Sequence, residues 1–286
     1  MDKSRIGIVE ETDESFRIPH SEFRIRIMDI LTFSPEQFKS FVLILIRISI
    51  VLFMFPILGS TMWPNLVKAG LALTISIILF PVVQPDPTLF PETILGGARL
   101  ILSELILGLI IGLTLRLFFT AVQLAGQLVG FQMGFAIANV LDPESGGQGP
   151  ILAQMGYWVA CLVFLLLNGH HVLLSTLSES FAVIKVGSLG LSDGLFHKML
   201  EVSGDMFTMA VKLGAPAIAA LLMTSAAFGI IAKVVPQMNI LIAAFPVKII
   251  VGLFFFGVCL EAVLYFTRHY VAGFGDMLRS LMLLML

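Results

Sequence analysis

Long apolar stretches without charge alternate with short polar breaks along this chain, and this pattern predicts helices that cross a membrane. A helix needs about 20 apolar residues to span the hydrocarbon core of a bilayer. Stretches of about this length or longer occupy 48–67, 69–85, 117–141, 145–178, 213–232 and 234–260, and only Lys248 interrupts the last of them. We therefore predict an all-α integral membrane protein with six or seven long apolar helices.

One region is too long for a simple crossing. No proline occurs between Pro91 and Pro143. An uninterrupted helix from Arg99 to Leu141 would be roughly 65 Å long, whereas a bilayer core is only about 30 Å thick. The segment must therefore fold back without proline or extend well beyond the bilayer. Glycines that would allow it to bend are Gly108, Gly112 and Gly126.

Small residues recur at every fourth position near the end of this region. They are Gly126, Gly130, Gly134 and Ala138. Positions four apart lie on one face of a helix, and small side chains there let a neighbouring backbone approach closely. The nearby Gln123, Gln127 and Gln132 need hydrogen-bonding partners if lipid or packed protein surrounds them. We predict that this helix-packing stripe lies inside a polytopic membrane assembly.

A polar loop follows the stripe, between two strongly apolar segments. The proline of Asp142-Pro143 favours a turn after Leu141, because it disfavours the helical conformation for the residue before it. Glycines in the loop allow positive φ or a close backbone approach, and a proline suits the first turn of the next helix. An ordinary turn would need only a few residues, so we interpret the loop as a gate or contact element. It consists of Asp142, Pro143, Glu144, Ser145, Gly146, Gly147, Gln148, Gly149 and Pro150.

Several charged and polar residues interrupt the apolar body. A charge at mid-bilayer costs about 2.5–3.5 kcal/mol on insertion scales, so such residues face protein, water or a lipid headgroup. Arg47 and Lys248 fit a second reading, in which the long side chain snorkels from a helix end. Glu104 fits this reading poorly because its side chain is short. The candidate buried polar or charged residues are Arg47, Glu104, Arg116, Asn168, His170, Gln237, Asn239 and Lys248.

Charge is concentrated at the beginning of the chain. The protein is 58% hydrophobic and 13% charged, compared with about 25% charged residues in soluble domains. Residues 1–39 hold 8 of the 19 acidic and 6 of the 17 basic side chains. We therefore divide the chain into a polar N-terminal extension, 1–37, which is mobile or interfacial, and a helical membrane domain, 38–286.

The sequence carries none of the common catalytic or cofactor motifs. There is no phosphate-cradling P-loop and no HExxH zinc motif. The two cysteines, Cys161 and Cys259, lie in separate apolar runs and define neither a disulfide framework nor a metal site. The net charge of −2 disfavours nucleic-acid binding. We expect no enzymatic activity, no cofactor and no metal.

Seven short segments, taken in order, resemble the FliR/SctT family of type III secretion export-apparatus proteins, and its flagellar branch most closely. The resemblance covers roughly residues 38–270, and the polar extension departs from the family pattern. The segments are ELILGLIIGL (104–113), AGQLVGFQMGFA (125–136), DPESGGQGP (142–150), FLLLNGHH (164–171), GAPAIAALLM (214–223), AKVVPQMNI (232–240) and FPVKIIVG (245–252).

The resemblance implies a subunit of a protein export gate in the bacterial inner membrane, within the export apparatus of the flagellar basal body. Family members are bent helical hairpins that assemble with FliP and FliQ, and FlhB wraps around the complex. The assembly rises above the membrane, which would account for the overlong region. The loop matching 142–150 would help to plug the channel through which flagellar proteins are secreted.

Three alternatives stay open at this point. The chain could be an injectisome subunit of the same family, although the PQMN and NGH segments favour the flagellar branch. A secondary transporter for a small solute would show two repeated halves and a compact ionisable site, and neither is evident. The third alternative is a scaffold that does not contact the pore.

Overall fold

The computed structural model describes residues 34–59, 63–83, 91, 93–135, 151–188, 190, 192–237 and 239–285. These residues form α-helices and turns without any strand, which confirms the predicted all-α class. The expected stripe position Ala138, the loop 142–150 and the polar N-terminal residues 1–33 lie outside the described residues.

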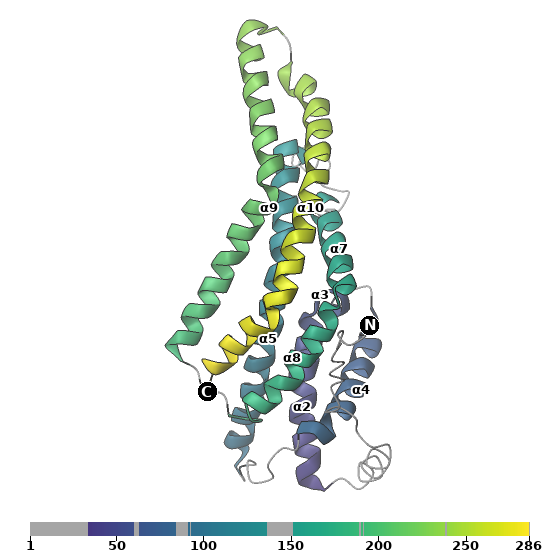
Figure 1. Cartoon of the computed structure of the whole chain (residues 1–286), viewed down its shortest axis with the longest axis vertical. Helices are drawn as coiled ribbons and strands as arrows, with labels where there is room; N and C mark the ends of the chain where they lie inside the picture. The colour runs from purple at the N-terminus through teal and green to yellow at the C-terminus, as the bar shows by residue number, and fades with distance from the viewer. Residues whose placement is uncertain are drawn as a thin grey trace, which may run out of the picture.

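The molecule is an elongated stack of helical hairpins whose long helices run roughly along its longest axis (Figure 1). The first hairpin pairs α2 (Pro35–Met54) with α4 (Asn65–Val83), with the short α3 (Pro56–Gly59) between them. A capping box starts α2, because the Ser34 hydroxyl accepts from the N–H of Gln37 while the Gln37 side chain accepts from the N–H of Ser34. Helix α2 ends at Met54, and Pro56 is the first residue of α3, a position that suits proline because its missing N–H is not needed there.

The long helix α5 (Ile94–Met133) passes through the middle of the molecule and packs against α2, α7 and α9. It contains 40 residues in one uninterrupted helix, which is roughly 60 Å at about 1.5 Å per residue. Of the two alternatives that the sequence left open, the helix does not fold back at a glycine but continues to a length well beyond that of a bilayer core. Its glycines serve packing instead: a Cβ built at Gly112 would lie 2.5 Å from the Cβ of Met54.

A bend separates α7 (Ile151–Leu166) from α8 (Gly169–Val183), at an angle of 69°. Asn168 occupies the bend with φ of 57° and ψ of 27°, a left-handed conformation that Asn tolerates better than most residues. Its carbonyl accepts from the N–H of His171 at 2.9 Å. The polar interruption at 168–170 is thus a hydrogen-bonded kink.

The last hairpin pairs α9 (Asp193–Val234) with α10 (Ile240–Leu283) and projects beyond the rest of the molecule (Figure 1). Helix α9 begins at Asp193, with the Ser192 hydroxyl accepting from the N–H of Leu195. Helix α8 ends at Val183, and the described residues between it and α9 (184–188, 190 and 192) are non-helical.

Two apolar clusters hold the hairpins together. The larger joins α2, α5, α7, α8 and α10 in the lower part of the molecule, and the smaller joins α5 and α7 to the α9–α10 hairpin higher up. Five of the described helices are long and apolar enough to cross a membrane, or six if the bent pair α7 and α8 counts as one. A count of six membrane-spanning helices agrees with the lower value of the predicted six or seven.

Candidate functional site

The glycine stripe near the end of α5 packs against α7 of the same chain. A Cβ built at Gly126 would lie 2.6 Å from the Cα of Ala153 and 2.7 Å from its backbone nitrogen. No side chain larger than hydrogen fits at that separation unless the two helices move apart. Gly130, the next position in the stripe, is also buried. The stripe therefore fixes the angle and spacing of the α5–α7 hairpin.

The helix ends earlier than the stripe predicts. Gly134 is the C-cap of α5, with φ of 94°, and its N–H donates to the carbonyl oxygen of Phe131 at 3.1 Å. A Cβ built there would lie 3.3 Å from the ring of Phe245 on α10. The described chain resumes at Ile151, the first residue of α7. Met133 and Leu152, which are next to these two helix ends, are buried in the smaller apolar cluster.

Arg47 and Glu104 form an ion pair that is completely excluded from solvent. Arg47 Nε donates to Glu104 Oε2 at 2.6 Å and Arg47 Nη2 donates to Glu104 Oε1 at 3.1 Å, with both side chains 0% exposed. The second reading, in which Arg47 snorkels from a helix end, does not hold, because its guanidinium has a carboxylate partner inside the bundle. A buried charge is tolerated when it is both paired and hydrogen-bonded.

Backbone groups and an aromatic ring from residues 180–187 complete this buried cluster. Arg47 Nη1 donates to the carbonyl oxygen of Ser180 at 3.0 Å, and its Nη2 donates to that of Ile184 at 3.4 Å. The backbone N–H of Gly187 donates to Glu104 Oε1 at 2.8 Å. The Phe181 ring lies over the guanidinium, with Cζ 4.1 Å from its centroid. The cluster therefore ties α2 and α5 to the end of α8 and to the turn before α9.

Sequence reasoning missed these partners. Neither Ser180 nor Gly187 is among the polar candidates that the sequence suggested. The carbonyl groups of Ser180 and Ile184 give no signal in a sequence, because every residue has one. The available clue was that Glu104 is the one acid among the candidates, with Arg47, Arg116 and Lys248 as possible partners.

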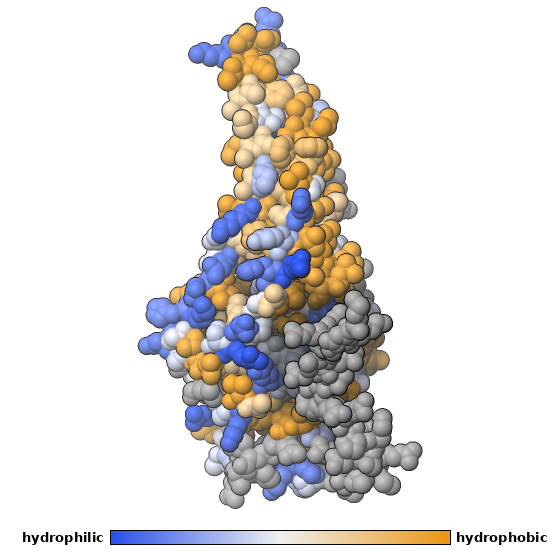
Figure 2. Space-filling view, in the orientation of Figure 1, coloured by the Kyte–Doolittle hydropathy of each residue, from blue (hydrophilic) through white to orange (hydrophobic). Residues whose placement is uncertain are grey.

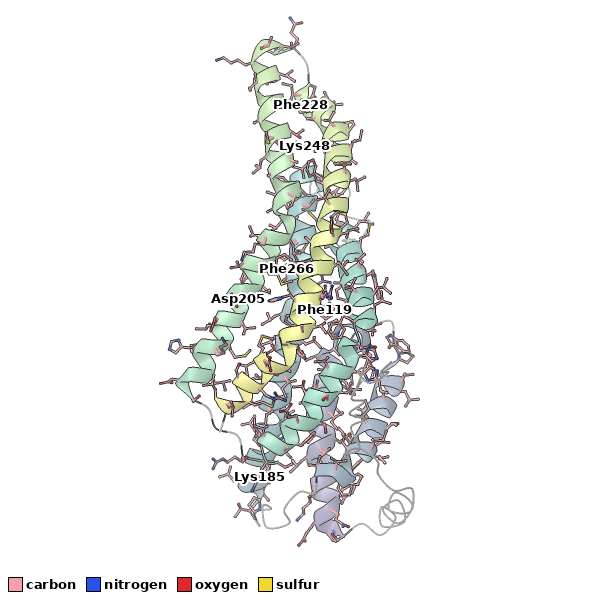
Figure 3. All side chains as sticks on the ribbon, viewed as in Figure 1. Phe119, Lys185, Asp205, Phe228, Lys248 and Phe266 are labelled. Carbon is pink, nitrogen blue, oxygen red and sulfur yellow. The ribbon has the colours of Figure 1, made fainter. Side chains whose placement is uncertain are left out.

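The other polar candidates do not join the cluster. Four of them are exposed rather than buried: Arg116, Asn168, Gln237 and Asn239. Asn168 lies at the bend, and Gln237 and Asn239 lie at the tip of the α9–α10 hairpin, where chain reversal keeps side chains outside the helix packing. Lys248 and His170 are half-buried. Lys248 lies about two turns inside α10, in the projecting hairpin (Figure 3).

The projecting hairpin has an apolar surface that no described part of the chain covers. Figure 2 shows hydrophobic residues over most of this extension and hydrophilic residues at its tip and lower on the molecule. Met223, Ile230, Ile250 and Phe254 are each about 70% exposed or more (76%, 69%, 70% and 69%). Contiguous apolar surface of this kind marks contact with lipid or with another protein.

The described residues contain no group of three or more His, Cys, Asp or Glu side chains that could hold a metal ion. The rings of His170 and His171 lie 4.4 Å apart between centroids. The arrangement supports packing, a buried ion pair and an apolar contact surface rather than a set of reacting groups.

Comparison with known proteins identifies the family of this chain. The family model described as "Bacterial export proteins, family 1" matches residues 38–274. The flagellar biosynthetic protein FliR of Bacillus subtilis (strain 168) is 34% identical over 252 residues, which cover 87% of this chain and 96% of that protein. The protein of the same name from Escherichia coli (strain K12) is 27% identical over 237 residues, covering 83% and 90% of the two chains.

A similar match, 29% identical over 254 residues, is to the flagellar biosynthetic protein FliR of Pectobacterium carotovorum subsp. carotovorum. The matched region contains every described helix except the first residues of α2 and the end of α10. On this evidence the chain, an all-α integral membrane protein, belongs to family 1 of the bacterial export proteins.

Proposed function

We propose that this protein is a non-enzymatic subunit of the flagellar type III protein export gate in the bacterial inner membrane. There it helps to form and to plug the channel through which flagellar proteins leave the cell. The observation that carries the proposal is the 34% identity to a flagellar biosynthetic protein over 96% of that protein's length. The description of the matching family, "Bacterial export proteins, family 1", also supports a role in export.

The proposed partners are homologues of FliP and FliQ, with an FlhB homologue around the complex and exported flagellar proteins as cargo. The exposed apolar surface of the α9–α10 hairpin supports such an assembly, because a lone subunit would leave it uncovered. The overlong helices α5, α9 and α10 also suit a complex that rises out of the membrane plane.

Two parts of the chain have separate roles in this proposal. The glycine stripe shapes the α5–α7 hairpin and so helps to seat the subunit in the assembly. The loop 142–150 closes the channel before secretion begins. The support for this role is the position of the loop in the sequence, between helix ends whose neighbouring residues Met133 and Leu152 are buried.

Deletion of the gene in its own host tests the proposal. We expect loss of flagellin from the culture medium and loss of swimming, both restored by a plasmid copy of the wild-type gene. Normal flagella in the deletion strain would contradict the flagellar role. Loss of a virulence-type secretion system with normal flagella would indicate an injectisome subunit instead.

Affinity purification in mild detergent tests the partners. Wild-type protein should bring down the FliP and FliQ homologues, whereas Gly130→Leu should not, because a bulky side chain would distort the buried face of α5. A protein that restores swimming but purifies alone would contradict the proposed complex without contradicting the export role.

A further inference from the structure

An apolar groove of about 340 Å³ opens between the first turns of α2 and α5. Both helices begin at the lower end of the molecule in Figure 1. The groove is open, since Phe38 and Ile101 in its walls are 58% and 42% exposed. Its apolar walls are Phe38, Val42 and Leu43 from α2 and Leu100 and Ile101 from α5, and Lys39 is the one charged residue of the described lining.

This groove lies one helical turn from the buried ion pair. Leu43 is four positions before Arg47 on α2, and positions four apart share a helix face. Leu100 is likewise four positions before Glu104 on α5. The Leu100 side chain also packs against Gly187, whose N–H donates to Glu104. A segment seated in the groove would therefore add a second layer between the ion pair and water, where buried charges interact more strongly.

The start of α2 directs the preceding chain toward the groove. Ser34 and Gln37 form a capping box there. In this motif, an apolar residue just before the N-cap often packs against the fourth residue of the helix. Phe33 precedes Ser34, and Phe38 is the fourth residue of α2. Since Phe38 is also a wall of the groove, this contact would lay the chain before α2 along the groove.

The segment before α2 has the length and the composition to occupy the groove. Residues 30–33 read ILTF, and three of the four are apolar. Four residues of extended chain span roughly 13 Å at about 3.3 Å each. The α2 wall from Ser34 to Val42 has nearly the same length, roughly 12 Å at about 1.5 Å per residue. The segment is also joined covalently to α2, which gives it an effective concentration on the order of millimolar over any free competitor.

We propose that residues 30–33 dock in the groove between α2 and α5, with Ile30 and Leu31 against its apolar walls. The docked segment closes the groove one turn from the Arg47–Glu104 pair. The inner end of the N-terminal extension thereby becomes part of the folded domain. The inference concerns contacts within one chain, so it is independent of the proposed export role.

Cysteine labelling of the full chain in mild detergent tests the proposal. The probe site is Ile101→Cys in the groove, and the matched control is Leu109→Cys, which lies on the same helix outside the groove. The described structure exposes the two native side chains equally, at 42% and 43%. Both native cysteines are buried, which keeps background labelling low. A docked segment should make a maleimide react with Ile101→Cys roughly tenfold more slowly than with Leu109→Cys, because two apolar side chains must first leave the groove.

Replacing the docking side chains identifies what covers the groove. Ile30→Asp combined with Leu31→Asp should release the segment and bring the Ile101→Cys rate up to that of Leu109→Cys. Equal rates in the chain with its native segment would overturn the proposal. Protection that persists in the aspartate variant would overturn it too, and would assign the groove to detergent, lipid or another protein.

A second arm fills the groove from the α5 side and leaves residues 30 and 32–33 unchanged. Leu31→Cys and Ile101→Cys should form a disulfide on mild oxidation, and adding Gly97→Phe should abolish it. A Cβ at Gly97 meets nothing within 4 Å, so the ring enters the groove without displacing the helices. The control Gly70→Phe, at an equally open position on α4 outside the groove, should leave the disulfide yield unchanged. Absence of the disulfide without Gly97→Phe, or an undiminished yield with it, would contradict docking.

Discussion

Arg47 on α2 holds Glu104 on α5 through two hydrogen bonds, of 2.6 and 3.1 Å, at a site where neither side chain is exposed. A second bidentate pair, between Arg279 and Glu179, lies nearby on the surface, with side chains 57% and 32% exposed. The same chemistry therefore occurs twice in one molecule, once buried and once in solvent. This gives an internal control for the effect of burial.

Glu104→Gln should strongly destabilise the protein, because it leaves the Arg47 guanidinium buried without a counter-charge. The loss expected for a broken buried pair is about 3–5 kcal/mol. The measurement is the midpoint of thermal unfolding of the purified protein in detergent. The surface variant Glu179→Gln should lose less than about 1 kcal/mol.

A double variant separates an unpaired charge from a simple loss of packing. Replacing both partners, as Arg47→Met with Glu104→Leu, should recover part of the stability lost in Glu104→Gln. The recovery is partial because the Ser180 carbonyl and the Gly187 N–H lose their partners too. Equal losses in Glu104→Gln and Glu179→Gln would show that burial of the pair does not matter.

The Arg47–Glu104 pair shows which features of the buried cluster can be predicted from the sequence alone. Both residues were recognisable as charges embedded in apolar runs, but their pairing joins positions 57 apart in the chain. Hydropathy reports the cost of a buried charge and not the location of its partner. Arg47 was therefore equally compatible with snorkelling, and tertiary packing alone decides between the two.

The length of α5 shows a second limit of prediction from the sequence: the point at which a helix ends. The sequence correctly predicted an overlong helical region within 99–141, because no proline interrupts it. The observed end at Gly134 depends on a left-handed C-cap, and periodic glycines read equally well as a continued packing stripe. Likewise, the exposure of Gln237 and Asn239 follows from chain reversal at the hairpin tip, which hydropathy does not locate.

Gly126→Ala should force α5 and α7 apart, because the new Cβ would lie 2.6 Å from the Cα of Ala153. Overpacking of this kind costs about 1–3 kcal/mol, measured as a lower midpoint of thermal unfolding. The control is Gly257→Ala on α10, where a Cβ meets nothing within 4 Å. It should be neutral or stabilising by up to about 1 kcal/mol, since alanine favours helix. Identical midpoints for the two variants would contradict the close approach.

Asn168→Val should destabilise the bend between α7 and α8, because a β-branched residue is disfavoured at φ of 57°. The expected loss is about 1–2 kcal/mol relative to Asn. Asn168→Gly should be tolerated, because glycine adopts this conformation freely. Thermal unfolding of both variants compares them directly. A valine variant as stable as the glycine variant would mean that the left-handed conformation is not needed for the bend.

Deletion of Gly146–Gly149 should raise ion leakage through the membrane of cells that produce the proposed complex. The physical reason is that a shortened loop cannot reach across and close the channel, while the buried Met133 and Leu152 keep the hairpin intact. Leakage is measured as membrane conductance, or as growth inhibition by a small permeant ion. The matched control removes an equal number of residues, Glu10–Asp13, from the polar extension outside the family match. Unchanged conductance together with normal copurification of the FliP and FliQ homologues would show that the loop does not restrain the closed channel.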